Sequence, residues 1–132
     1  MSMMSLELQW LVLVATATAL MWIPHILQLI VQEGLWRAVR DPAREVAHKA
    51  PWAQRARRAH ANAVENLAIF APLALLVAAT GSATSATALA AAVFFWARLG
   101  HFAAYVFAVP FARVVLFLVG WACQLVLAAA LI

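Results

Sequence analysis

The sequence contains few charged residues and long runs with none. Of its 132 residues, 11% are Asp, Glu, Lys or Arg and 67% are hydrophobic. Ordinary soluble proteins have about a quarter of their residues charged. This shortage of charge excludes a soluble globular domain with a solvated surface and indicates an integral membrane protein.

The sequence also has only one cysteine and lacks the features of a secretory signal. The chain has one cysteine, Cys123, so it can form no disulfide within itself, and the surrounding apolar run favours a packing role. The first ten residues, MSMMSLELQW, lack the basic region of a secretory signal. We therefore expect the first apolar segment to be retained. No repeat or second domain is visible, and residues 1–132 are interpreted as a single membrane domain.

The charge-poor runs predict an all-α bundle of four transmembrane helices. A spanning helix needs about 20 mostly apolar residues. Residues 80–87, TGSATSAT, supply a turn between the second and third spans, and Pro110 marks the connection to the fourth. The spans are expected at about residues 6–31, 60–80, 86–108 and 111–132.

Proline should kink the first span at Pro24. His25 and Gln28 lie beside this kink, where polar side chains need partners in protein or interfacial water. They are interpreted either as interfacial anchors or as functional groups.

Positive charge is concentrated between the first two spans. Residues 32–59 hold seven of the nine Lys and Arg residues. These are Arg37, Arg40, Arg44, Lys49, Arg55, Arg57 and Arg58. The positive-inside rule makes this loop cytoplasmic and places both termini on the opposite side. Prolines in RDPARE and KAPW favour short interfacial helices within it. The basic run is short and lacks interleaved aromatics, so anionic lipid headgroups are expected as its contact and nucleic acid is not.

Polar residues form two stripes at helical spacing in the second and third spans. Residues at i, i+3 or i+4 and i+7 share one face of a helix. The first stripe comprises Arg58, Asn62, Glu65 and Ile69, the second comprises Arg98, His101 and Tyr105, and Arg113 begins the fourth span on the same side. Facing lipid would be costly for so many polar groups, so the stripes are expected to line a protein interior or a wet cavity.

Two interpretations of these stripes remain open. In a structural one, Arg58, Glu65 and Arg98 pair with each other, and Asn62 and Tyr105 hydrogen-bond between helices. In a functional one, the arginines outnumber the single carboxylate and leave positive charge for an anion. A small acidic or zwitterionic ligand entering from the cytoplasm would satisfy that charge.

Three segments carry a resemblance to a known family. They are RRAHANAVENLAIF, ARLGHFAAYV and PFARVVLFLVG. Together they resemble the MAPEG family, the membrane-associated proteins in eicosanoid and glutathione metabolism, which includes microsomal glutathione transferases and leukotriene-forming synthases. The resemblance covers nearly all of the chain, and the stretch MWIPH makes it more similar to bacterial microsomal glutathione transferase-like members.

The resemblance implies a homotrimer that binds glutathione as co-substrate between adjacent subunits, with no metal. In the second helix, the residues that match the family's glutathione site are Arg57, Arg58, His60, Asn62 and Glu65. In the third helix Arg98 and Tyr105 match, and Arg113 matches the arginine held to stabilise the thiolate. Tyr105 is expected to donate to the same sulfur or to a ligand carboxylate. The chain departs from the mammalian transferases at IVQEGLWR, where Arg37 is the nearest substitute for a first-helix arginine.

The expected function is therefore that of a glutathione transferase or peroxidase with a role in detoxification. It would act on lipophilic electrophiles or lipid hydroperoxides that arrive from the bilayer, and the expected location is a bacterial inner membrane. A non-catalytic scaffold or regulator with the same fold is the alternative. A proton-coupled transporter is less favoured, because no inverted repeat is visible and Glu65 is the only acidic residue expected within the spans.

Overall fold

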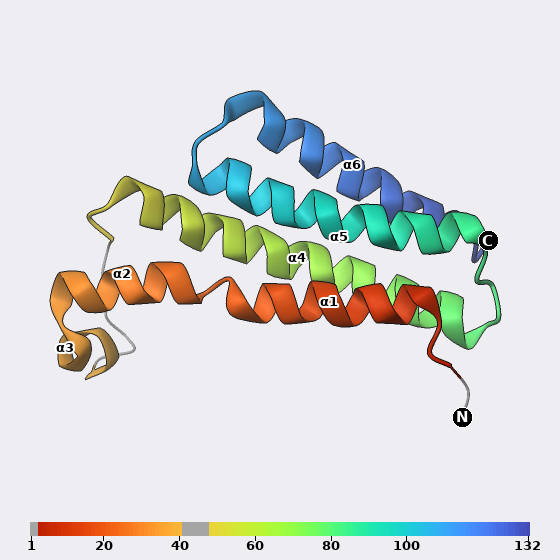
Figure 1. The fold of residues 1–132 in the computed structure, drawn as a ribbon, viewed down its shortest axis with the longest axis horizontal. Helices are drawn as coiled ribbons and strands as arrows, with labels where there is room; N and C mark the ends of the chain where they lie inside the picture. Colours follow the sequence, from red (N-terminus) through yellow and green to blue (C-terminus); the bar gives the residue numbers. More distant parts are fainter. Residues whose placement is uncertain (1–2, 41–47) are drawn as a thin grey trace.

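The described part of the chain consists mainly of helices (Figure 1). The structure is a computed structural model that describes residues 3–40 and 48–132. Arg44 of the predicted basic loop lies outside these residues. Within them there are six helices and no strand: α1 (Leu6–Leu20), α2 (Ile23–Glu33), α3 (Leu35–Arg40), α4 (Pro51–Ala79), α5 (Ser85–Val106) and α6 (Pro110–Ala129).

Four helical segments are long and apolar enough to cross a membrane. They are Leu6–Glu33, which joins α1 to α2, and then Pro51–Ala79, Ser85–Val106 and Pro110–Ala129. The all-α architecture with four spans is thus confirmed. Both termini and the α4–α5 turn lie at one end of the bundle, whereas α3 and the α5–α6 connection lie at the other (Figure 1).

The first span is interrupted between α1 and α2. Pro24 lies in the first turn of α2 and has no backbone N–H to donate to the carbonyl of Leu20. At the end of α1 the Met21 amide donates to the carbonyl of Thr18, three residues earlier and not four, at 3.2 Å. The kink expected at Pro24 therefore takes the form of a break at residues 21–22, just before the proline.

The helix that contains the second span begins nine residues before the expected start of that span. Helix α4 starts at Pro51 and not near residue 60, and its 29 residues exceed the roughly 20 needed to span hydrocarbon. A proline in the first turn is compatible with a helix, because the first N–H groups have no partner within it. Arg55, Arg57 and Arg58 therefore lie on this helix and not in a loop, whereas α3 is a short helical piece of the expected kind.

Small side chains bring the helices together. On α4 the residues Ala53, Ala56, Ala59 and Ala63 are buried, as membrane helix contacts favour. Further along, Phe70 of α4 stacks on Phe94 of α5 with ring centroids 4.0 Å apart, and Leu127 of α6 packs into the same cluster. The large apolar side chains on the outside, such as Trp96 and Phe111, are suited to contact lipid.

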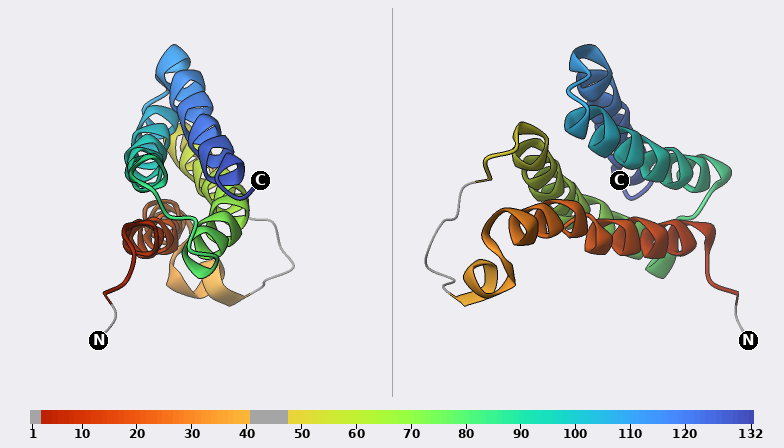
Figure 2. Two further views of the ribbon diagram at one scale, coloured as in Figure 1. Left: turned by 90° about the vertical axis from the view of Figure 1, so that its right-hand side faces the viewer. Right: turned by 60° about the vertical axis from the view of Figure 1, so that its left-hand side comes forward.

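Helices α1 and α4 form one packed pair and α5 and α6 another, and contacts between α4 and α5 join the two pairs (Figure 2). Helix α5 packs on α6 along its length and also contacts α1 and α4, while α2 packs on α3 and α4. At the end near α3, Nε of Arg55 donates to the backbone carbonyl of Val106 at 2.9 Å, which satisfies a carbonyl at the end of α5. This bond ties the start of α4 to the end of α5.

A buried carboxyl group joins α1 to α5 at the other end. Glu7 is 2% exposed and its Oε1 accepts a hydrogen bond from Oγ1 of Thr87 at 2.6 Å. Thr87 also forms a capping box with Thr84 at the start of α5. The expectation that Glu65 is the only acidic residue within the spans was wrong, because α1 already contains Glu7.

Candidate functional site

The centre of the site is a buried arginine on α5. Arg98 is 3% exposed, and its Nη2 donates to Oδ1 of Asn62 on α4 at 2.6 Å. The same nitrogen lies 3.4 Å from Nδ1 of His101, one turn further along α5. Nε and Nη1 of Arg98 are buried without a hydrogen-bond partner in the described part of the chain. Buried donors are almost always paired in proteins, so these two nitrogens indicate a missing acceptor.

Helix α6 faces the stem of Arg98 at Gly120. A side chain at buried Gly120 would place its Cβ 3.5 Å from Cδ of Arg98 and 3.7 Å from the ring of Phe94. The guanidinium therefore lies in a layer enclosed by α4, α5 and α6. No carboxylate is bonded to it in the described residues, so its charge is available to an anion.

Tyr105 and Arg113 extend this site toward the subunit surface. The ring of His101 meets that of Tyr105 edge to face at 5.7 Å between centroids. The guanidinium carbon of Arg113 lies 4.8 Å from the centroid of the Tyr105 ring, which is cation–π geometry. Arg113 itself is exposed. The structure thus brings Asn62 of the first stripe together with Arg98, Tyr105 and Arg113.

Arg57 and Arg58 line a separate pocket near the start of α4. This pocket has a volume of about 290 Å³, and its other lining residues are His48, Gln54 and Ala61. Both arginines are exposed, so their guanidinium groups are accessible to a ligand carboxylate or to a neighbouring subunit.

His60 lies with other histidines and not beside Arg98. Its ring centroid is 5.8 Å from that of His25, which is 5.6 Å from that of His48. Nδ1 of His48 is 2.7 Å from Oε1 of Gln28, within hydrogen-bond distance. Burial and the charge of Arg57 lower the pKa of His48. No group of three or more His, Cys, Asp or Glu side chains in the described residues is arranged to hold a metal ion.

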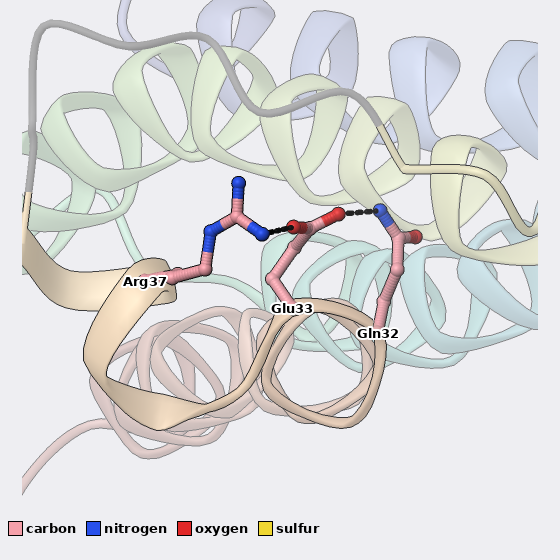
Figure 3. A network of polar contacts seen from close by, with 3 residues as sticks. All are labelled: Gln32, Glu33 and Arg37. Carbon is pink, nitrogen blue, oxygen red and sulfur yellow. Dashed lines mark hydrogen bonds and ion pairs between the residues drawn. The ribbon is translucent and has the colours of Figure 1, made fainter.

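Glu65 is exposed on α4. Among the described residues there is no ion pair between Arg58, Glu65 and Arg98, so the pairing assumed by the structural interpretation is absent. An ion pair is found instead between Nη1 of Arg37 and Oε2 of Glu33, 3.8 Å apart (Figure 3). Nε2 of Gln32 donates to the other oxygen of Glu33 at 2.9 Å (Figure 3). Arg37 thus has a local partner beside α2.

Three side chains near the site were not among the predicted site residues. His101 was assigned to the stripe but not to the site, and Asn66 and Gln124 were overlooked. All three are buried. The available signal was polarity, since an amide within an apolar span needs a hydrogen-bond partner inside the protein.

Comparison with known families supports the family resemblance of RRAHANAVENLAIF, ARLGHFAAYV and PFARVVLFLVG. A family model described as the MAPEG family matches residues 9–132, which include every residue of the site. No curated protein and no solved structure matches the chain.

Proposed function

The chain belongs to the MAPEG family, and from this premise we propose that it activates the thiol of glutathione for attack on lipophilic electrophiles or lipid hydroperoxides. Family membership makes it an integral membrane protein of glutathione-related metabolism. The observation that carries the more specific proposal is the buried Arg98, whose Nε and Nη1 have no partner in the described residues. An anionic ligand supplies the missing acceptors.

The charges of glutathione match those of the surrounding side chains. Its two carboxylates suit the forked guanidinium groups of Arg98 and of Arg57 or Arg58. Its ammonium suits the carboxylate of Glu65, which is exposed on the same helix as both of those arginines. Asn62 and His60 contribute hydrogen-bonding groups of either polarity.

Arg113 is the group proposed to activate the thiol. A free thiol with a pKa near 8.5 is mostly protonated at neutral pH, so a nearby positive charge is needed to favour the thiolate. Arg113 lies in the first turn of α6, where the helix N-terminus adds its own positive field. Tyr105, which contacts Arg113, can donate its hydroxyl proton to the sulfur or to a ligand carboxylate.

The chemistry follows from an anionic sulfur. In conjugation, the thiolate forms a carbon–sulfur bond with the electrophile and its leaving group departs with the bonding electron pair. In peroxide reduction, the thiolate attacks one peroxide oxygen and the O–O bond breaks. The lipid leaves as an alcohol after taking up a proton, and a second thiol converts the resulting sulfenic acid to a disulfide and water. Both reactions need a lipophilic substrate, which the bilayer supplies.

We further propose that the site is completed in a homotrimer. Arg57, Arg58, Glu65 and Arg113 are all exposed on one subunit, although charged groups facing lipid are costly. A neighbouring subunit that covers these faces removes that cost and encloses glutathione between two chains. The assembly is then a closed ring with one site at each boundary.

The basic end of the bundle is proposed to be cytoplasmic, in a bacterial inner membrane. Lys49 lies two residues before α4 and Thr84 is the N-cap of α5, and the starts of these two helices lie toward opposite ends of the bundle (Figure 1). In a Cys123→Ala background, a cysteine at position 49 should react with an impermeant maleimide only after the cytoplasmic side is opened. A cysteine at position 84 should react in intact cells, and the reverse pattern would show that the orientation is wrong.

The function is tested by binding and turnover in mild detergent. Calorimetry should detect glutathione and also S-methylglutathione, which retains both carboxylates and the ammonium but has no ionisable thiol. Conjugation of a chlorinated nitrobenzene and reduction of a lipid hydroperoxide are then assayed in parallel. Binding with neither reaction would favour the alternative, a non-catalytic scaffold or regulator. Absence of binding would refute the proposal.

A further inference from the structure

A chain of buried amides runs from α6 to Arg98. Gln124 is 4% exposed, and its Nε2 donates to the backbone carbonyl of Asn66 on α4 at 3.2 Å, with Oδ1 of the same residue at 3.5 Å. Asn66 is 7% exposed. Its Nδ2 donates to the backbone carbonyl of Asn62 at 2.9 Å and lies 3.3 Å from Oδ1 of Asn62. That oxygen also accepts from Arg98.

The chain has a defined direction. Arg98 can only donate, so the Asn62 amide must turn its oxygen toward the guanidinium. Asn66 supports this orientation, because its own NH₂ group points to the same oxygen. For Asn66 to present NH₂ to Asn62, its oxygen must face away, toward the NH₂ group of Gln124. Each amide thus fixes the orientation of the next.

Burying polar amides in an apolar span costs free energy unless they are hydrogen-bonded. Gln124 lies within an apolar span, where an amide without partners would cost several kcal/mol. An apolar residue would pack there without needing any hydrogen bond. The three amides have partners in one another, whereas Nε and Nη1 of Arg98 have none among residues 3–40 and 48–132. The network therefore holds the guanidinium through Nη2 alone and leaves two nitrogens for another group.

We propose that Gln124 and Asn66 are positioning residues, which orient Arg98 through the amide of Asn62 so that Nε and Nη1 are each left to donate a hydrogen bond to a ligand oxygen. This inference rests on the proposed function for the identity of the ligand. Neither residue touches glutathione in this proposal. Both act through Asn62, which makes their effect dependent on that side chain.

The test replaces the relay and its target separately and together. Gln124→Met removes the first donor at nearly constant volume, and losing one neutral hydrogen bond should weaken glutathione binding about threefold to tenfold. Asn62→Ala disconnects the relay from Arg98. In that background Gln124→Met should have no further effect, because the two changes interrupt one pathway. Thr18→Val is the matched control, since the buried Thr18 hydroxyl donates within α1, to the carbonyl of Val14 at 2.8 Å.

Additive effects of Gln124→Met and Asn62→Ala would overturn the proposal, as would an unchanged dissociation constant in a folded Gln124→Met trimer. If Gln124→Met does not fold, Gln124→Asn keeps the amide but shortens its reach, and the same two outcomes apply. If the wild type binds no glutathione, the proposed function fails and the relay is tested by NMR of the ¹⁵N-labelled guanidinium. Exchange of the Nε proton of Arg98 should then accelerate in Gln124→Met, and an unchanged rate would contradict the relay.

Discussion

Replacing Arg98 by methionine should stabilise the ligand-free protein while abolishing its affinity for glutathione. Methionine has a similar length and no polar hydrogen to satisfy. The buried guanidinium carries two nitrogens without partners in the described residues, and its one short bond goes to Asn62. A residue kept for its ligand and not for its packing should behave in this way.

The magnitude follows from the hydrogen bonds that are present and missing. Each unsatisfied buried donor costs about 1–3 kcal/mol, so removing two of them should contribute roughly 4 kcal/mol to stability. Losing the charge-assisted bond to Asn62 costs about 1.5–3 kcal/mol. The net expectation is a stabilisation of about 2 kcal/mol, with Asn62 still accepting from Asn66.

The assay is reversible unfolding in mixed micelles of SDS and a mild detergent, followed by circular dichroism after exhaustive dialysis against glutathione-free buffer. Arg98→Lys is the matched variant, because it keeps the charge but has a single nitrogen. The reasoning would be refuted if Arg98→Met lowered the free energy of unfolding by more than about 2 kcal/mol. Such a loss is expected when a fully hydrogen-bonded structural arginine is removed. That result would place the missing acceptors on a neighbouring subunit and favour the structural interpretation.

Three further outcomes are expected. Glu65→Gln should raise the dissociation constant of glutathione about tenfold or more by removing a charge-assisted bond to its ammonium. Calorimetry measures this constant. A collapsed trimer with normal glutathione binding per folded subunit would instead show that Glu65 has a structural role. The folded protein should lose stability as pH falls below about 6.5, because burial and Arg57 lower the pKa of His48 and the unfolded chain then binds the extra proton. His48→Gln should flatten this slope in unfolding titrations, and an unchanged slope would contradict the assignment. Native mass spectrometry from mild detergent should give a trimer, and a monomer would remove the basis for a shared site.

The parts of the fold that were predictable depend on local composition. Charge-poor runs located four spans because a membrane helix must be apolar over about 20 residues. Helical spacing placed Asn62 on one polar stripe and Arg98 on the other, and the structure shows that Arg98 bonds Asn62 within one subunit. The start of α4 was missed because Arg55, Arg57 and Arg58 resemble a loop in composition, although the surrounding alanines favour a helix.

What could not be predicted depends on how helices rotate against each other. His60 is only two residues from Asn62, yet it faces His25 of α2, because adjacent positions on α4 point toward different neighbours. Asn66 and Gln124 are 58 residues apart, and only packing of α4 on α6 reveals their contact. Glu7 was not considered at all, and only the contact with Thr87 of α5 reveals the partner for its buried carboxyl group.

The central claim, that Arg113 stabilises a glutathione thiolate at a site shared with Arg98 and Tyr105, is tested most directly by ultraviolet difference spectroscopy. Adding glutathione to the wild-type protein at neutral pH should produce thiolate absorbance, because the charge of Arg113 lowers the pKa of the bound thiol. A lowering by one unit corresponds to about 1.4 kcal/mol of thiolate stabilisation. Arg113→Ala should bind glutathione through the remaining arginines but lose this absorbance. Thiolate absorbance and turnover that are unchanged in a folded Arg113→Ala protein would contradict the account.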